Sequence, residues 1–189
     1  MKMSGDKKAA VELSISTIVI VVLAMSMLIL GLVLVRSIFT GATSIADMTN
    51  TQVKNQIAKL FAEDQKLVIY PDSRQITIKQ GATPDGFGIG IKNLMQGSTT
   101  AVKFSYEVVV SDPDLQKKCG VGEKEAEGWI VTGRSEDNMQ IASGDFISPK
   151  VLLSVPVGAP LCTLRYRVNV KANGQAYASD LMDITIAAK

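Results

Sequence analysis

The segment from Leu13 to Val35 contains no charged residue and constrains the chain more than any other part of the sequence. At a rise of about 1.5 Å per residue, a helix of this length covers about 35 Å, which exceeds the roughly 30 Å hydrocarbon core of a bilayer. Apolar side chains fall on every side of such a helix, so no face is suited to water. The segment therefore predicts a helix that spans a membrane and satisfies its backbone internally.

Two other interpretations of this segment are a cleaved secretory signal and a helix buried in a protein core. The apolar region of a signal peptide is usually about 7 to 15 residues long, which is shorter than this segment. The nearby small-x-small sequence at residues 44–46 lies beyond Arg36, which breaks the order expected around a signal cleavage site. The sequence favours an anchor that stays attached to the protein.

Charges around the apolar segment predict its orientation. Lys2, Lys7 and Lys8 precede it, and Arg36 is the basic residue that follows closely. Because basic residues tend to stay on the cytoplasmic side, we expect a single-pass cell-membrane protein with a cytoplasmic N-terminus and an exported C-terminal part. The expected organisation is a short basic cytoplasmic leader at 1–12, a transmembrane helix at 13–35, a linker and amphipathic helix at 36–65, and one extracytoplasmic domain at 66–189.

Composition argues against most catalytic and nucleic-acid-binding functions. The chain has no histidine, which removes the Ser-His-Asp and Cys-His nucleophile systems and the commonest ligand of catalytic zinc. Its 20 basic and 18 acidic residues are scattered along the sequence and nearly balance, which does not suit a nucleic-acid surface. We therefore expect no enzymatic activity, cofactor, metal, small-molecule substrate or nucleic-acid partner.

The two cysteines, Cys119 and Cys162, fall in the part expected to be exported, where oxidising conditions let disulfides persist. Two separate buried thiols are the alternative, since spacing alone does not establish a pairing. We expect a disulfide, which closes a loop of about 44 residues and stabilises the domain by about 4 kcal/mol in the chain-entropy model. A redox or metal role has less support, because the sequence has no CxxC motif.

An amphipathic pattern follows the apolar segment between Ile45 and Asp64. Its apolar side chains recur at i, i+4, i+7 and i+8, which places them on one face of a helix. This stripe consists of Val53, Ile57, Leu60 and Phe61. The stripe needs a partner surface, and the sequence leaves three open, which are the exported domain, the lipid surface and the same helix in a second copy.

From Lys66 onward, short runs rich in β-branched residues alternate with turn signals. This spacing predicts an antiparallel sandwich, for which an Ig-like arrangement is the expected form. The fold class is therefore expected to be α+β, with a long N-terminal transmembrane and amphipathic helix followed by an antiparallel Ig-like β-sandwich. The predicted strands are 67–70, 75–79, 87–93, 102–110, 129–132, 139–142, 150–155, 164–170 and 177–186.

Two other segments offer weaker functional hypotheses. Five carboxylates around Cys119 in residues 111–128 suit calcium, but lysines lie among them without EF-hand spacing, so a solvated loop is favoured. The glycine-bearing run from Gly86 to Gly90 is superficially similar to a phosphate-binding loop. Because no helix follows this run, it is better interpreted as a strand.

The N-terminal region combines a short basic leader ending at Ala9, a following Ala10 and Glu12, and then the long apolar segment. This arrangement resembles the class III signal of type IV pilins and archaellins, particularly archaeal ones. In that family a prepilin peptidase cuts ahead of the apolar helix and leaves it attached. The retained helices then pack together as the core of a filament.

Carried onto this sequence, the resemblance implies that Ala9 is the last leader residue and Ala10 the new N-terminus. Glu12 would compensate the freed amine of a neighbouring subunit. Considered without the resemblance, Glu12 is either an interfacial carboxylate favoured at a helix N-terminus or a partner for a cation inside the membrane. The resemblance implies a homo-oligomer formed through the N-terminal helix, with a prepilin peptidase as a processing partner.

Two pieces of the β-rich region resemble archaeal and bacterial Ig-like adhesion modules. One is the strand at 75–80, which turns through Gly81 into a strand ending at 92–93, and the other is the run 155–160 leading into 165–170. This likeness bears on the fold, because Ig-like sandwiches host adhesion, scaffolding and filament roles alike.

Two functions from different classes follow. The first is a structural subunit of a type IV pilus-like or archaellum-like surface filament, assembled through the N-terminal helix with the sandwich exposed. The alternative is a permanently anchored extracytoplasmic adaptor whose sandwich binds an envelope layer, a stator or a partner ectodomain. Cleavage of the leader distinguishes them.

Overall fold

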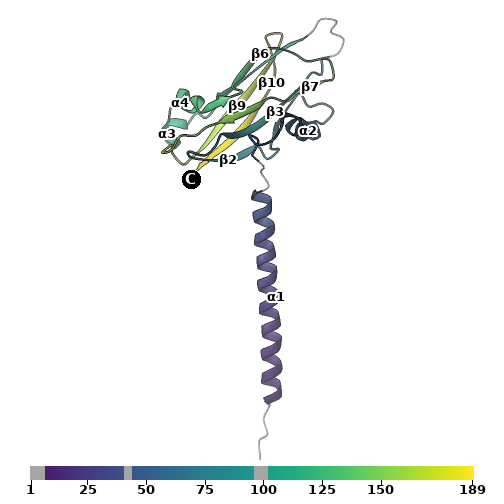
Figure 1. The fold of residues 1–189 in the computed structure, drawn as a ribbon, viewed down its shortest axis with the longest axis vertical. Helices are drawn as coiled ribbons and strands as arrows, with labels where there is room; N and C mark the ends of the chain where they lie inside the picture. The colour runs from purple at the N-terminus through teal and green to yellow at the C-terminus, as the bar shows by residue number, and fades with distance from the viewer. Residues whose placement is uncertain (1–6, 41–43, 96–101) are drawn as a thin grey trace, which may run out of the picture. The chain divides into compact units, whose positions relative to one another are not determined.

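The computed structural model describes residues 7–40, 44–95 and 102–189, and it divides the chain into two compact units, Met1–Thr43 and Ser44–Lys189. Side chains are described for residues 16–33, 44–95 and 102–189. The first unit contains one long helix, and the second contains two β-sheets with shorter helices, as Figure 1 shows. The two-sheet α+β organisation expected from the sequence is therefore confirmed at this level.

Helix α1 runs from Lys7 to Thr40 and includes the whole apolar segment. Within it, the 18 residues Ser16–Val33 are long and apolar enough to cross a membrane, a property that signal sequences share. Their large side chains, such as Leu28 and Leu30, are exposed in this unit. The hydroxyl of Ser26 donates a hydrogen bond to the carbonyl of Val22 at 2.7 Å, so the helix itself satisfies this polar group.

The first sheet has the strand order β1-β3-β8-β5, with β7 also paired to β3. Its strands are β1 (Leu67–Tyr70), β3 (Asp85–Lys92), β5 (Ile130–Thr132), β7 (Phe146–Ile147) and β8 (Lys150–Leu153). All of its pairings are antiparallel. The glycine-bearing run at 86–90 lies in the centre of β3, as its interpretation as a strand requires.

The second sheet has the order β2-β10-β9-β4-β6. Its strands are β2 (Gln75–Lys79), β4 (Lys103–Val110), β6 (Ser135–Gln140), β9 (Thr163–Ala172) and β10 (Gln175–Ala187). β2 pairs with β10 in parallel, whereas β9, β4 and β6 pair antiparallel. The expectation of an entirely antiparallel arrangement was therefore wrong. β2 and β10, the first and last strands of this sheet along the chain, run side by side, and alternation within either strand carries no information about their relative direction.

One cluster of buried side chains from both sheets forms the main core. Phe87 and Ile89 of β3 are fully buried, and so are Val168 of β9 and Ile184 of β10. In β9 every second residue from Leu164 to Ala172 is buried, as expected for a strand with one face on a core. The intervening residues form the opposite face of the second sheet.

Helix α2 (Asn50–Leu60) covers the outer face of the first sheet. It begins with a capping box, in which the Gln52 N–H donates to the Thr49 hydroxyl at 3.3 Å and the Thr49 N–H donates to the Gln52 side chain at 2.7 Å. Val53 and Ile57 are fully buried against this sheet. The expected stripe therefore packs on the domain. The compact unit accordingly begins at Ser44, ahead of the boundary expected at residue 66.

Two glycines of β3 let α2 approach the sheet. A Cβ at Gly90 would lie 2.4 Å from Ile57 Cγ2, 2.7 Å from Val68 Cγ2 and 2.9 Å from Phe61 Cε2. A Cβ at Gly88 would lie 3.1 Å from both Val53 and Ile57. Gly88 and Gly90 therefore serve helix packing.

Residues 111–128, expected as a solvated loop, contain two short helices, α3 (Leu115–Cys119) and α4 (Glu123–Gly128). The loop expectation was wrong because three apolar side chains of this segment, Leu115, Val121 and Ala126, are buried in the main core. The expected Cys119–Cys162 disulfide is present and ties the end of α3 to the segment before β9. Figure 1 shows α3 and α4 on the opposite side of the domain from α2.

Candidate functional site

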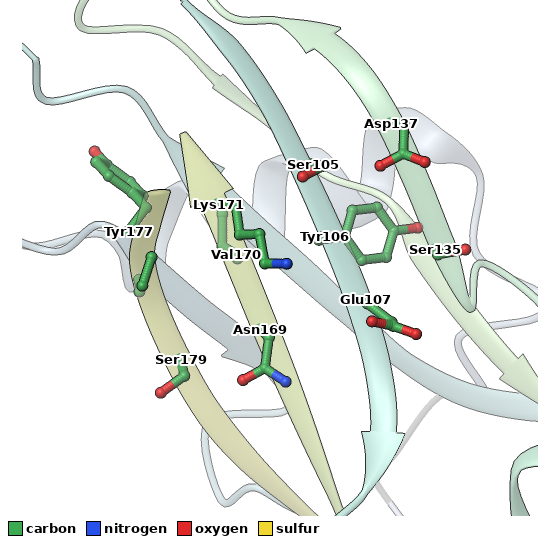
Figure 2. Close-up of a pocket in the computed structure, with 12 residues that line it drawn as sticks. Ser105, Tyr106, Glu107, Ser135, Asp137, Asn169, Val170, Lys171, Tyr177 and Ser179 are labelled. Carbon is green, nitrogen blue, oxygen red and sulfur yellow. The ribbon is translucent and has the colours of Figure 1, made fainter. Parts of the chain in front are cut away.

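The outer face of the second sheet is hollowed across four of its strands. The cavity has a volume of about 590 Å³ and lies over β10, β9, β4 and β6. Pairing register places two rows of side chains across it. The first row is Ser179, Asn169, Glu107 and Ser135, each directly opposite the next. The second row contains Ala176, Lys171 and Ser105, and Figure 2 shows Asp137 of the next strand near Ser105.

Small side chains make this region concave. Ala176, Ala178 and Ser179 line the cavity from β10, and Ser105 lines it from the centre of β4. Lys171 of β9 lies between Ala176 and Ser105 in the second row. The hollow is therefore a product of side-chain size on an open sheet face, and it is accessible to a ligand from solvent.

Tyr177 lines the hollow with a hydroxyl that is already paired, since it donates to the Lys92 carbonyl at 2.8 Å and accepts from the Leu94 N–H at 3.0 Å. Seven other polar side chains of the hollow have no partner within the protein, as far as residues 16–33, 44–95 and 102–189 are concerned. No side-chain hydrogen bond or ion pair involves any of them in that part of the chain, and they present one ammonium, two carboxylates, one amide and three hydroxyls. The residues are Ser105, Glu107, Ser135, Asp137, Asn169, Lys171 and Ser179.

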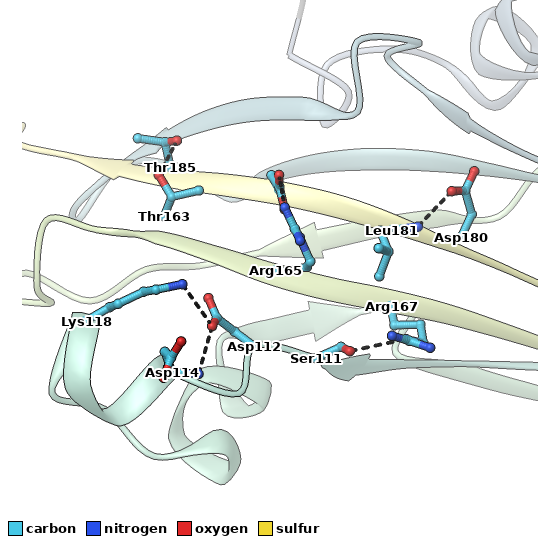
Figure 3. Close-up of polar contacts among 11 residues, drawn as sticks. Ser111, Asp112, Asp114, Lys118, Thr163, Arg165, Arg167, Asp180, Leu181 and Thr185 are labelled. Atoms are coloured by element: carbon cyan, nitrogen blue, oxygen red, sulfur yellow. Dashed lines mark hydrogen bonds and ion pairs between the residues drawn. The ribbon is translucent and has the colours of Figure 1, made fainter.

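Farther along β9 and β10 the polar side chains are different, because they pair with each other or with neighbouring residues (Figure 3). The Arg165 guanidinium donates to both carboxylate oxygens of Asp183, at 2.7 and 2.9 Å. Its Nη and Nε hydrogen bonds hold the pKa of Asp183 below its usual value, and the carboxylate raises the pKa of Arg165. The hydroxyls of Thr163 and Thr185 are 2.9 Å apart. Polar side chains therefore pair with one another in this part of the sheet, whereas seven of the polar side chains in the hollow do not.

Tyr106 forms part of the lining between β4 and β6 (Figure 2). Burial of its side chain, with a smaller contribution from the negative charge of Glu136, raises the pKa of Tyr106 to about 12. The phenol therefore stays protonated and neutral at physiological pH. It supplies a hydroxyl that both donates and accepts hydrogen bonds.

A second cavity, of about 360 Å³, lies where Arg165 and Asp183 approach Asp112 and Lys118. Its charges are already matched, since the Lys118 ammonium lies 3.3 Å from Asp112 and the Asp114 N–H donates to the same oxygen at 3.1 Å. Within the described residues, no group of three or more His, Cys, Asp or Glu side chains is arranged to hold a metal. The carboxylates of residues 111–128 therefore do not gather into a calcium site there.

The sites expected from the sequence are distributed over both units. Ala9, Ala10 and Glu12 belong to helix α1, but their side chains lie outside the described residues. Of the stripe, Leu60 and Phe61 are partly buried beside fully buried Val53 and Ile57. Sequence reasoning missed the hollow. Polar residues do alternate along β4 and β9, but which of them become neighbours is decided by strand register.

Comparison with known proteins does not assign the chain to a family. No protein-family model matches the sequence, and no curated protein matches it. One solved structure with some likeness is the Pseudomonas fluorescens alkylpurine DNA glycosylase AlkC bound to DNA containing an abasic site analog, with a TM-score of 0.29 and 10% sequence identity. The match covers 63% of this chain and 29% of that chain. A likeness this slight carries no inference about fold or function.

Proposed function

We propose that the protein is a structural subunit of a type IV pilus-like or archaellum-like surface filament. In this proposal α1 is the assembly element, and the β-domain is the exposed surface. The N-terminus is cytoplasmic before processing, and a prepilin peptidase removes the leader ahead of Ala10. The protein has no catalytic role in this proposal.

One observation carries the proposal, namely the apolar circumference of α1. Every large apolar side chain described in Ser16–Val33 is exposed, so water cannot be the neighbour of this helix. Lipid meets this need before assembly, and the helices of other copies meet it in a filament core. The stripe of α2 is already buried on the first sheet, which leaves α1 as the element available for assembly.

Two features of the β-domain agree with an exported location. The Cys119–Cys162 disulfide suits an oxidising compartment. Two sheets enclosing one core also support the Ig-like sandwich, with the parallel β2–β10 pair as its departure from the usual immunoglobulin arrangement.

The second candidate function is a permanently anchored adaptor that binds an envelope layer or a partner ectodomain. The hollow on the second sheet favours it, because unpartnered polar side chains on an exposed face are available to a ligand. The two candidates differ in whether the leader is removed and whether the helices assemble.

The experiment that tests the filament proposal compares sheared surface material from cells that express the wild type, Glu12→Ala and, as a control, Glu63→Ala. Glu63 is an exposed carboxylate of the β-domain, so its loss should change nothing. We expect Glu12→Ala to insert into the membrane normally but to reduce filament recovery strongly, because the Ala10 amine then lacks its partner.

Mass spectrometry of the wild-type N-terminus accompanies this comparison, with a start at Ala10 as the expected result. Abundant filaments from the Glu12→Ala cells would contradict the compensating role. An intact leader in a membrane-bound protein that forms no filaments would favour the anchored adaptor.

A further inference from the structure

We infer that the hollow of the second sheet binds carbohydrate, as an extended saccharide chain lying across β10, β9, β4 and β6. The inference deepens the second candidate function and rests on the β-domain being exposed outside the cell. It does not depend on filament assembly. Its first basis is the unpartnered state of seven polar lining side chains within the described parts of the chain.

The mixture of hydrogen-bonding groups in the hollow selects the ligand class. Lys171 only donates, Glu107 and Asp137 only accept when ionised, and Asn169 and the serine hydroxyls do both. A sugar hydroxyl also donates and accepts, so one hydroxyl-rich ligand pairs with every group in the hollow. No ligand that is only a donor or only an acceptor does so.

The same groups disfavour other ligand classes. A phosphate or nucleic-acid strand would meet the carboxylates of Glu107 and Asp137. A metal ion would meet the Lys171 ammonium, and the described residues hold no three-residue cluster of metal-binding side chains. A wholly apolar ligand would leave the charged and polar groups of Lys171, Glu107 and Asp137 without hydrogen-bonding partners. Of the ligand classes considered, a neutral polar ligand is the one that suits the groups in the hollow.

The shape of the site indicates a chain rather than a single small molecule. Each row of side chains crosses four strands, a distance of about 14 Å at the usual spacing between strands. The cavity opens on the sheet face and is not enclosed, so both ends of a linear ligand can extend beyond it. The rows run across the strands, and we expect the saccharide to lie in that direction.

The test uses the full chain purified in a polyoxyethylene detergent, because alkyl glycoside detergents would compete for the site. The probes are soluble hexasaccharides of glucose, mannose, galactose and N-acetylglucosamine, titrated by calorimetry at low salt and again at high salt. We expect at least one hexasaccharide to bind, with an affinity that changes little with salt because the ligand is uncharged.

Variants locate the site. Asn169→Ala removes a side chain that both donates and accepts at the centre of the first row, and we expect binding to fall about tenfold. Thr163→Ala changes an exposed residue of the same strand outside the hollow, and binding should be unchanged. Both variants should retain the wild-type melting temperature to within a few degrees, since neither side chain is in the core.

Three outcomes would overturn the inference. They are failure of all four hexasaccharides to bind the folded wild type, equal binding by wild type and Asn169→Ala, and binding that disappears at high salt, which hydrogen bonding to an uncharged saccharide does not explain. The Glu12 comparison tests the filament without involving the hollow, so failure of one proposal is distinguishable from failure of the other.

Discussion

Tyr166 shows how one buried polar group joins two parts of the core. Its side chain is fully buried, and its hydroxyl donates a hydrogen bond to the carbonyl of Ala126 at 2.8 Å. Burial, and to a smaller extent the charge of Glu127, raises the pKa of Tyr166 well above its ordinary value, so the hydroxyl remains a donor. This hydrogen bond connects β9 to α4.

We predict that Tyr166→Phe lowers the free energy of unfolding by about 1–3 kcal/mol, because the Ala126 carbonyl is left buried without its donor. Chemical denaturation of the purified protein measures the change. Tyr70→Phe is a suitable control, since Tyr70 is only partly buried. An unchanged stability of Tyr166→Phe would show that water replaces the lost donor.

At the scale of single elements, helix α2 packs closely on strand β3 because Gly88 and Gly90 of the strand have no side chains. The phenyl rings of Phe61 and Phe146 also meet here, with centroids 5.2 Å apart. The Ser44 hydroxyl and the Ile45 N–H both donate to Asp85, at 2.9 and 3.0 Å, and so fix the segment before α2 to the start of β3. The contact between helix and strand therefore begins at a polar anchor and continues as apolar packing.

We predict that Gly90→Ala destabilises the domain by about 1–3 kcal/mol, because the new methyl group overlaps Ile57, Val68 and Phe61. Gly128→Ala is the matched control, since a Cβ there meets nothing within 4 Å. Thermal unfolding of both variants measures the difference.

A double-mutant cycle assigns the effect to the helix contact. Because Ile57→Ala removes the atom nearest to the new methyl, the cost of the double variant should be less than the sum of the two single costs. Strict additivity would mean that Gly90 acts through the strand backbone and not through α2.

Sequence patterns predicted which segments form strands and helices better than they predicted which of these segments lie next to each other. Alternation identified β9 and β10, and the apolar spacing identified α2, because burial of one face leaves a period in the sequence. Strand β6 was expected at 139–142 but spans Ser135–Gln140, since an exposed edge strand with one buried residue has almost no such period. Two-residue β7 and the short helices α3 and α4 were missed because each is too short to show a period in the sequence.

The hollow could not be predicted from the sequence, and the reason is different. Asn169 and Glu107 are 62 positions apart in the sequence numbering (169 minus 107), and only the register of β4 on β9 makes them neighbours. The disulfide could be predicted, because the chain has two cysteines and there is one way to join them within the chain. Local patterns define elements, whereas binding surfaces on sheets are set by pairing.

At the scale of the whole molecule, the β-domain has two hydrophobic clusters and not one. The smaller cluster unites Ile45, Met48, Val53 and Ile57 with Val68 of β1. Residues before Lys66 thus supply most of it. A domain defined by its strands alone would leave this apolar face of the first sheet uncovered.

We predict that a fragment of residues 44–189 is a soluble monomer, whereas a fragment of residues 66–189 aggregates. The shorter fragment exposes Val68 and the surface around Gly88 and Gly90 that α2 normally covers. Size-exclusion chromatography with light scattering compares the two fragments after oxidation of the Cys119–Cys162 pair. Equal solubility and equal melting temperatures would show that α2 contributes little to the domain.

The parallel pairing of β2 with β10 has a consequence for when this domain folds. β10 is the last strand, and it lies between β2 and β9, so two strands of the second sheet lack a neighbour until it has been synthesised. A chain released by the ribosome before residue 175 leaves the edges of both strands open, and such edges are prone to aggregation and proteolysis. Completion of the sheet thus waits for the synthesis of β10, and chains that terminate before it keep open strand edges that proteases can recognise.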